Sequence, residues 1–206
     1  VVANHPYGGI DGLALGSLLS KTSSDFKILV NQELGVFQAM KPWLFQVDIL
    51  GGKSSRAQNL RTMAESSRYL RKGYCLGVFP AGEVSSLHLR TLKIIDPEWS
   101  NHPVSLARRN NAMILPVCFK GKNGWLFQVL GLVDPRLRTL LLGRELVNKR
   151  GKDLNMRIGE PVSAMKICLF EKLTDATEYL RICVEALKNE SYQVSSFAKF
   201  FAGCKS

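Results

Sequence analysis

The stretch Asn4-His5-Pro6-Tyr7-Gly8-Gly9-Ile10-Asp11-Gly12 places an imidazole and a carboxylate in one short segment. Histidine takes up and releases protons near neutral pH, and a carboxylate on its second nitrogen fixes the tautomer and the ring orientation. His5 and Asp11 are too far apart in sequence to share a helical face, but glycine at Gly8-Gly9 allows the chain to fold back. The segment is therefore compatible with a general base, His5, oriented by Asp11. It is equally compatible with a structural loop histidine and an aspartate that caps a helix.

The residues around this segment indicate which elements must position it. Val1-Val2-Ala3 is apolar and precedes it, and the run from Leu13 to Leu19 is typical of a helix. This order predicts a strand, a tight loop and a helix, with Asp11 near the helix N-terminus. A second stretch, Gly77 to Ser86, also predicts a strand that ends in a glycine-containing loop. Loops at the carboxyl ends of strands are where α/β proteins place their chemistry.

Together the two stretches resemble the glycerolipid acyltransferase family, whose signatures are His-x4-Asp and a downstream Phe-Pro-x-Gly loop. Five residues, Pro6 to Ile10, separate His5 from Asp11, one more than the common family spacing. The loop at Gly8-Gly9 can absorb the extra residue. The first stretch and Phe79 to Ser85 are most similar to the branch often labelled hemolysins, which includes acyltransferases of ornithine-lipid synthesis. Further matches at Ile114 to Phe119 and from Asp134 to Gly151 extend the similarity over most of the chain.

The resemblance implies a fold and a reaction. The expected fold is α/β, with a mostly parallel central sheet flanked by helices, in a single acyltransferase domain over residues 1–206. Because the first motif begins at Asn4, we expect the natural protein to carry a further segment upstream. The implied reaction moves a fatty acyl group from a thioester, acyl-CoA or acyl carrier protein, to the hydroxyl of a lysolipid. His5 is the expected base and Asp11 its partner, with no metal and no permanently bound cofactor.

The second loop is expected to shape the acceptor site. The predicted substrate-binding residues are Asn4, Phe79, Pro80, Ala81, Gly82, Glu83, Lys53 and Arg56. Family members that use glycerol phosphates read Phe-Pro-Glu-Gly-Thr-Arg in this loop, whereas this chain has Ala81, Glu83 and Val84 at the Glu, Thr and Arg positions. The missing arginine removes a bidentate phosphate partner, and a carboxylate suits a cationic or hydroxyl-bearing acceptor. We therefore expect lyso-ornithine lipid to be a better acceptor than lysophosphatidic acid.

Lys53 and Arg56 follow Gly51-Gly52 and could contact a phosphate, for instance that of coenzyme A. The alternative is that both are solvated charges near a helix start.

Composition bounds the partners and the compartment. The 206 residues include 28 Lys and Arg against 17 Asp and Glu, a net charge of +11, which favours an anionic membrane surface or an anionic donor. No zinc-like Cys/His spacing and no RNA-binding aromatic signature occurs, so no nucleic acid is expected. Five scattered cysteines indicate reduced thiols. The sequence contains no run of about 18 apolar residues, so it predicts no membrane span. We expect a peripheral protein on the cytoplasmic face of the inner membrane.

The remaining chain predicts alternating strands and helices. Strands are predicted at residues 27–31, 43–50, 74–79, 112–119, 125–132 and 156–159. Helices are predicted at 34–40 (ending before Pro42), from Ser54 or Ser55 to Lys72, at 104–111 and at 173–187. In the helix before Gly73, Ala57, Leu60, Ala64 and Tyr69 are expected on the buried side. Residues 87–103 are expected to form a loop or lid, in which His102 is a less favoured second catalytic residue.

Two segments have open interpretations. Residues 134–152 combine leucines with Arg and Lys, as in a helix that lies on an anionic membrane, although a surface helix packing on the sheet explains them as well. The tail carries Phe197, Phe200 and Phe201 beside Lys199, which indicates a membrane patch, a cover for the core or a frayed end.

Two other functions remain compatible with the sequence. A non-catalytic, hemolysin-like membrane-binding protein would explain the basic helix and the tail but leave the His5/Asp11 loop without a purpose. A thioesterase would use the same base with water as the acceptor.

Overall fold

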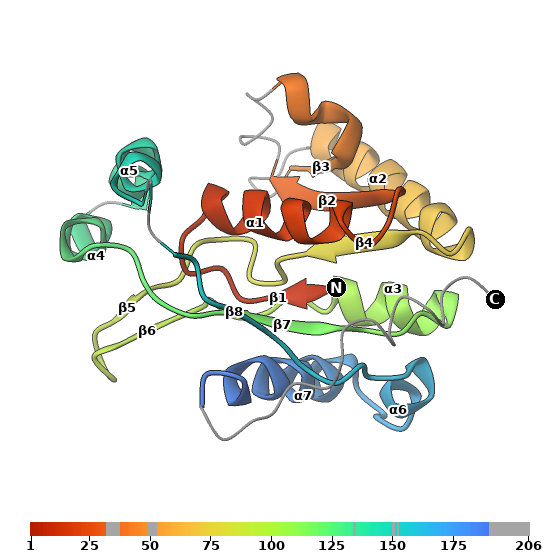
Figure 1. The fold of residues 1–206 in the computed structure, drawn as a ribbon. Coiled ribbons are helices and arrows are strands. Elements are labelled where there is room, and N and C mark those ends of the chain that lie inside the picture. The colour runs from red at the N-terminus through yellow and green to blue at the C-terminus, as the bar shows by residue number, and fades with distance from the viewer. Residues whose placement is uncertain (32–37, 49–52, 134, 150, 152, 190–206) are drawn as a thin grey trace.

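A computed structural model describes residues 1–31, 38–48, 53–133, 135–149, 151 and 153–189. Within helices it describes the backbone alone for residues 38–39, 53–55, 131–133, 135–140 and 146. The described residues form one large sheet with helices on both faces (Figure 1), which confirms the expected α/β class.

The central sheet has six strands in the order β3-β2-β4-β1-β7-β8. Their bounds are β1 (Val2–Ala3), β2 (Phe26–Asn31), β3 (Leu44–Val47), β4 (Cys75–Val78), β7 (Pro116–Phe119) and β8 (Met156–Ile158). Neighbouring strands pair in parallel, except that β8 runs antiparallel to β7. The short β1 lies in the interior, with Val2 opposite both Val78 and Pro116. The prediction of a mostly parallel sheet is thus confirmed.

The parallel strands bring the two motifs to one edge of the sheet. Since β1 and β4 are adjacent and parallel, their carboxyl ends lie at the same edge. The loop after β1 carries His5, and the loop after β4 carries Phe79 to Glu83. The parallel β7 adds a third loop there, Lys120 to Gly124.

Helices cover both faces of the sheet, because successive strand residues point to opposite sides. The helices are α1 (Gly9–Ser20), α2 (Lys53–Arg71), α3 (His102–Asn110), α4 (Trp125–Val133), α5 (Pro135–Asn148), α6 (Ala164–Cys168) and α7 (Leu173–Ala186). On one face, Ala3 and Val117 pack with Leu15 and Leu19 of α1. Gly77 of β4 permits this close approach, since a Cβ there would lie 3.0 Å from Leu15 Cδ2.

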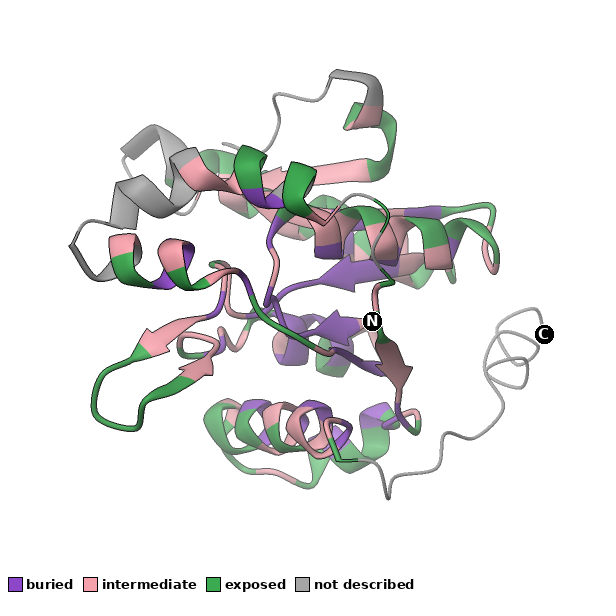
Figure 2. Cartoon of the chain, turned by 60° about the vertical axis from the view of Figure 1, so that its left-hand side comes forward, coloured by how far each residue is buried: buried purple, intermediate pink, exposed green. Residues whose placement is uncertain are grey.

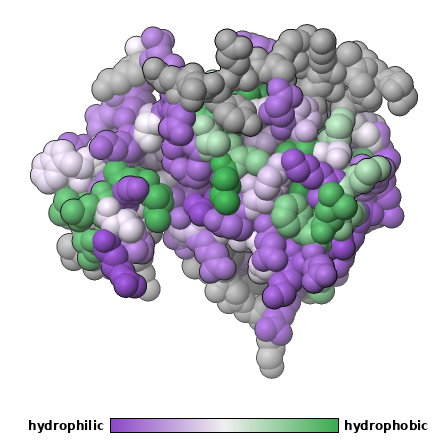
Figure 3. All heavy atoms as spheres, turned by 90° about the horizontal axis from the view of Figure 1, so that it is seen from below, coloured by the Kyte–Doolittle hydropathy of each residue, from purple (hydrophilic) through white to green (hydrophobic). Residues whose placement is uncertain are grey.

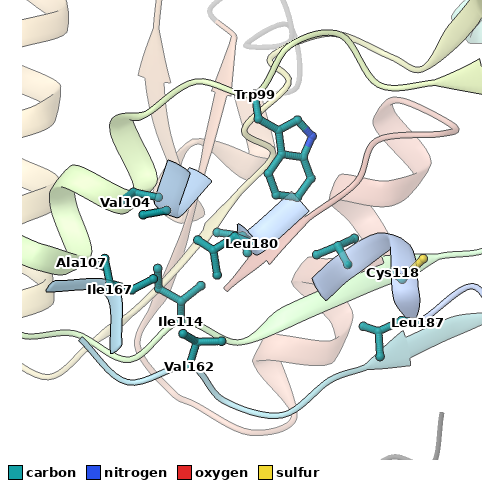
Figure 4. Close-up of a cluster of buried hydrophobic side chains, with 12 residues drawn as sticks. Trp99, Val104, Ala107, Ile114, Cys118, Val162, Ile167, Leu180 and Leu187 are labelled. Atoms are coloured by element: carbon teal, nitrogen blue, oxygen red, sulfur yellow. The ribbon is translucent and has the colours of Figure 1, made fainter. Parts of the chain in front are cut away.

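The other face is covered by α2, α3 and α7. Strands of the sheet interior are buried, whereas the turn between β5 (Ser86–His88) and β6 (Lys93–Ile95) is exposed (Figure 2). Helices α6 and α7 form part of the surface in Figure 3, where apolar side chains gather in separate patches among polar ones. Beneath them lies a core that includes Trp99, Ile114, Cys118, Leu180 and Leu187 (Figure 4).

No helix among the described residues is long and apolar enough to cross a lipid bilayer.

The structure corrects the sequence interpretation of residues 125–132. The predicted strand is helix α4, in which Phe127 and Gln128 are buried while Trp125 and Val129 are exposed. A continuous apolar run of this length does not distinguish a buried strand from a buried helix, and the exposed positions four residues apart follow the helical period.

The prediction of a loop or lid at residues 87–103 is wrong in its first part, where β5 and β6 form an antiparallel hairpin. The helix expected to end before Pro42 is also wrong in its described part: a 3-10 helix, Gln38–Trp43, contains Pro42, and residues 32–37 lie outside the described residues. Proline is tolerated there because a short 3-10 turn needs few backbone donors.

Helix α2 has the predicted extent but not the predicted buried side. Leu60 is 71% exposed, and Ala57 and Ala64 are exposed as well, whereas Thr62 and Ser66 are buried. Thr62 faces inward with hydrogen-bonding support, since its Oγ1 donates to Gln46 O at 2.9 Å. The prediction from hydrophobicity alone therefore placed the wrong face of α2 on the inside.

Candidate active site

Asn4 anchors the loop after β1 to the neighbouring strand β7. Its Nδ2 donates to Phe119 O at 2.9 Å, and its Oδ1 accepts from Phe119 N at 2.7 Å. Asn4 is buried, so the side chain continues the pairing of β1 with β7 where the strand itself has ended. This pairing fixes the backbone that carries His5.

His5 and Asp11 meet, which is one of the two arrangements that the sequence left open. His5 Nδ1 lies 3.0 Å from Asp11 Oδ2. The same oxygen accepts from Tyr7 N at 2.8 Å and from Gly8 N at 3.0 Å. Gly8 has φ +84 at the start of α1, so the chain reverses there and places Asp11 in the first helical turn beneath the imidazole. The extra residue is accommodated in this reversal.

The environment of the pair favours a fixed tautomer. Both side chains are buried. Burial raises the pKa of Asp11, while the hydrogen bond and charge of His5 and the amides of Tyr7 and Gly8 act in the opposite direction. With Asp11 ionised, Nδ1–H donates to it and the lone pair remains on Nε2. No described residue forms a hydrogen bond with Nε2, and none with Asp11 Oδ1.

The second loop contributes Phe79, whose ring stacks on His5 with centroids 4.3 Å apart. Gly82 has φ +69 and its amide donates to Phe79 O at 3.0 Å, which closes the turn. Pro80 is buried and Ala81 packs against the core under α7, whereas Glu83 is exposed. Of the five loop residues predicted to bind substrate, Phe79 and Gly82 line the pocket beside His5.

That pocket has a volume of about 180 Å³ and is mainly apolar. The two motif loops and the start of α1 contribute His5, Gly8, Gly9, Gly12, Leu13, Phe79 and Gly82. The strands β2 and β3 and the residues at their ends contribute Ile28, Leu29, Val30, Asn31, Met40, Leu44 and Val47. A titratable imidazole at the wall of an apolar pocket can act on a polar group attached to a hydrocarbon chain.

The structure places other predicted residues away from the pocket. The polar atoms of Asn4 are bonded to Phe119, and Arg56 is an exposed residue of α2 outside the pocket wall. Lys53 begins α2, and its side chain is outside the described part. His102 is exposed at the start of α3 and is not in the pocket wall either. Within the described ranges, no group of three His, Cys, Asp or Glu is arranged to hold a metal ion.

Sequence reasoning missed a second carboxylate beside the histidine. Asp96 Oδ1 accepts from His5 N at 3.2 Å and from Ser85 Oγ, and Asp96 Oδ2 accepts from Trp99 Nε1 at 3.0 Å. Ser85 N in turn donates to His5 O at 2.9 Å. Ser85 closes the second motif, but nothing in the local sequence connects it or Asp96 with His5.

Comparisons with known proteins agree with this architecture. The model of the family described as Acyltransferase matches residues 1–194. A lyso-glycine lipid O-acyltransferase of Phocaeicola vulgatus is 28% identical over 168 residues, which cover 78% of this chain and 58% of that protein. A lyso-glycine lipid O-acyltransferase of Bacteroides thetaiotaomicron is 27% identical over 168 residues, or 78% of this chain and 59% of that protein. The chain thus spans less than two thirds of the length of these relatives.

A solved structure shares the fold. The 1-acyl-sn-glycerophosphate acyltransferase PlsC from Thermotoga maritima superposes with a TM-score of 0.55 over 95% of this chain and 67% of that chain, at 17% identity. Because the sequence identities to these proteins are low, the family assignment rests on the family model, which matches nearly the whole chain. The chain belongs to the family described as Acyltransferase.

Proposed function

We propose that this protein transfers a fatty acyl group from an acyl thioester to the hydroxyl of a lysolipid that carries an amino-acid headgroup. The observation that carries the proposal is the 3.0 Å contact of His5 Nδ1 with Asp11 Oδ2 at the wall of an apolar pocket. The names of the two bacterial relatives, both lyso-glycine lipid O-acyltransferases, support the reaction class.

In the proposed step, His5 Nε2 takes the proton of the acceptor hydroxyl as its oxygen attacks the thioester carbonyl carbon. Asp11 holds the ring and stabilises the imidazolium that forms. The tetrahedral intermediate then collapses, the C–S bond breaks, and the departing thiolate takes the proton from the imidazolium. The products are an ester and a free thiol, and no covalent acyl-enzyme is required.

The apolar pocket is the proposed site of a fatty acyl chain. Its walls from β2 and β3 carry hydrocarbon side chains, which favour a chain desolvated beside the base. The first amides of α1 lack i−4 carbonyl partners, and Gly8 and Gly9 line the pocket. Since the Gly8 amide already donates to Asp11 Oδ2, we propose that the Gly9 amide stabilises the oxyanion, helped by the positive end of the helix.

For the acceptor, we propose an amino-acid lysolipid, lyso-glycine or lyso-ornithine, in preference to lysophosphatidic acid. Glu83 and Val84 stand at the Thr and Arg positions of the loop used with glycerol phosphates. Val84 Cγ2 would lie 3.1 Å from a Cβ at Gly8, so an apolar side chain borders the turn that carries the catalytic pair. A guanidinium for phosphate is therefore missing from this position, and the exposed Glu83 suits the amine of ornithine.

The proposed donor is acyl-CoA or acyl carrier protein, with no permanently bound cofactor. Both are anionic, and the net charge of +11 favours either. Lys53 and Arg56 remain proposed contacts to a donor phosphate. We also propose that the protein works at the cytoplasmic face of the inner membrane.

The test is lipid mass spectrometry after incubation with a labelled acyl donor. Acyl-CoA and acyl carrier protein are each offered with lyso-glycine lipid, lyso-ornithine lipid and lysophosphatidic acid. We expect labelled diacylated amino-acid lipid and little phosphatidic acid. Replacing His5 with Ala should abolish the product and leave the fold intact, while His102→Ala, which changes an exposed histidine of α3, should leave turnover unchanged.

Each alternative has its own outcome. Release of labelled free fatty acid without dependence on an acceptor would identify a thioesterase. Vesicle leakage that persists in His5→Ala, without acyl transfer by the unaltered protein, would identify a non-catalytic membrane-binding protein. Preferred acylation of lysophosphatidic acid would refute the acceptor assignment while keeping the reaction.

A further inference from the structure

The turn of the β5–β6 hairpin presents two leucines to solvent. Leu89 is 64% exposed and Leu92 is 76% exposed. The amides of Thr91 and Leu92 both donate to His88 O, at 3.2 and 2.8 Å, so the turn is closed by its own backbone. Leu92 has φ +52, a conformation that branched side chains rarely adopt. The leucines are therefore held outward by a defined turn.

Cations accompany these leucines, and acids do not. Arg90 and Lys93 are exposed beside them, and no Asp or Glu occurs between Glu83 and Asp96. Leucine combined with Arg and Lys is typical of segments that enter the interface of an anionic membrane. Charge complementarity thus selects an anionic lipid surface as the partner.

The exposed apolar patch on α6 and α7 differs from the hairpin turn in its charges. On the face of α6 and α7 (Figure 3), the exposed apolar residues include Leu169 and Ile182. Exposed acids lie nearby in sequence, Glu171 and Glu178 among them. Because Lys166 and Lys172 are exposed there as well, that face carries charges of both signs, whereas the hairpin turn carries cations alone.

The stem of the same hairpin is tied to the catalytic loop. Ser85, just before β5, donates through its amide to His5 O at 2.9 Å, and Asp96, just after β6, accepts from His5 N at 3.2 Å. Leu87 N donates to Gln128 Oε1 of α4 at 2.9 Å, which braces the hairpin from the side. The adjoining α4 begins with the exposed Trp125, and tryptophan favours membrane interfaces.

We infer that the β5–β6 turn, with Leu89, Arg90, Leu92 and Lys93, inserts into an anionic lipid surface and sets the catalytic loop at a fixed place above it. The proposed lysolipid acceptor would then enter from that surface. Only this last consequence rests on the proposed function, because binding to a lipid surface is measurable without turnover.

The test is flotation of the 206-residue protein with vesicles of phosphatidylcholine, with and without phosphatidylglycerol. Leu89→Ser/Leu92→Ser should lower partition to the anionic vesicles at least about tenfold, since two inserted side chains are lost. Arg90→Gln/Lys93→Gln should lower it at low salt and reduce its salt dependence. The matched control is Leu169→Ser, which removes a leucine 78% exposed at the end of α6 and should leave partition unchanged.

Three results would overturn the inference: no preference of the unaltered protein for anionic vesicles, undiminished partition of the double leucine variant, or an equal loss in Leu169→Ser. Circular dichroism confirms that each variant is folded. Acyl transfer to a lysolipid in vesicles and to the same lysolipid dispersed in detergent is then compared. The double leucine variant should lose activity only on vesicles. Absent transfer in both formats refutes the proposed function and leaves the partition result standing.

Discussion

The carboxylate of Asp96 accepts a hydrogen bond from the backbone amide of His5, 3.2 Å away and 91 positions earlier in the sequence. Because Asp96 also accepts from Ser85 Oγ and Trp99 Nε1, it joins the loop that carries His5 to the hairpin stem and to the core under α7. Asp11 orients the imidazole of His5, whereas Asp96 fixes the backbone that carries it. The two carboxylates therefore act at different ends of one residue.

Replacing Asp96 with Asn should separate these roles. One side-chain oxygen remains for His5 N and Ser85 Oγ, but the amide NH₂ then faces Trp99 Nε1–H, a donor against a donor. We expect kcat to fall roughly tenfold as the loop loses its position, with KM for the acceptor nearly unchanged. Steady-state kinetics on a dispersed lysolipid measures both constants.

The control for Asp96→Asn is Glu98→Gln, which neutralises an exposed carboxylate two positions away. It should leave kcat unchanged. A rise in KM without a fall in kcat would assign Asp96 to acceptor binding instead of positioning.

Replacing Asp11 with Asn should abolish most activity while keeping the fold. The amide oxygen can take the Oδ2 position and accept from His5 Nδ1, Tyr7 N and Gly8 N, but it carries no charge to stabilise the imidazolium. We expect kcat to fall on the order of 10²–10⁴-fold. Single-turnover acyl transfer measures the loss, and near-normal turnover would remove the carboxylate from the mechanism.

The same variant tests the electrostatics of the buried pair. Burial raises the folded-state pKa of Asp11 above its unfolded value, so ionisation costs stability as pH rises from the unfolded pKa through the folded one. The asparagine side chain of the variant does not ionise. The free energy of unfolding of Asp11→Asn relative to the unaltered protein should therefore increase between about pH 4 and about pH 8. Urea unfolding at both pH values checks the sign, with the exposed Asp153→Asn as control.

The local parts of the site are predictable from the sequence. A strand, a glycine turn and a helix follow one another between Val2 and Ser20, so the meeting of His5 and Asp11 depends on few backbone angles. The loop at Phe79 and Gly82 is similarly local, and the alternation of strands and helices predicts the parallel sheet that brings both loops together.

The parts that depend on distant contacts are not predictable in this way. Asp96 meets His5 only because the hairpin returns to β1, and neither the hairpin nor α4 has a periodicity that distinguishes it from its alternatives. In α2 the buried Thr62 bonds to Gln46 of β3, so a polar side chain is favoured on the inside. The Asn4 side chain likewise points toward β7 because it bonds to Phe119, and the motif around Asn4 does not indicate this contact.

Replacing Gly8 with Ala should destabilise the turn between His5 and Asp11. Gly8 has φ +84, and a Cβ there would lie 2.8 Å from Leu142 Cδ2. Backbone strain and this contact should lower the free energy of unfolding by about 1–3 kcal/mol. Gly9→Ala is the matched control, because nothing lies within 4 Å of its Cβ position and its φ is ordinary. Equal destabilisation of the two variants in urea would contradict the strained geometry of Gly8.

Replacing Asn4 with Ala separates a structural role from the predicted substrate contact. Both polar atoms of the side chain bond to the backbone of the buried Phe119, so truncation removes the partner of Phe119 N and leaves Phe119 O with the weak Cys118 Sγ donor at 3.7 Å. We expect the free energy of unfolding to fall by about 2–4 kcal/mol. Urea unfolding measures this loss, with Asn155→Ala as the control at an exposed position.

Kinetics of Asn4→Ala decide between the two roles. If Asn4 only holds β1 to β7, KM for the lysolipid should stay within about twofold at temperatures where the variant is folded, because the pocket wall does not include it. A several-fold rise in KM with unchanged stability would restore the predicted substrate contact. A structural role predicts lower stability with unchanged KM, whereas a substrate contact predicts a higher KM with unchanged stability. Because both polar atoms of the buried Asn4 side chain are bonded to Phe119, we expect the first result.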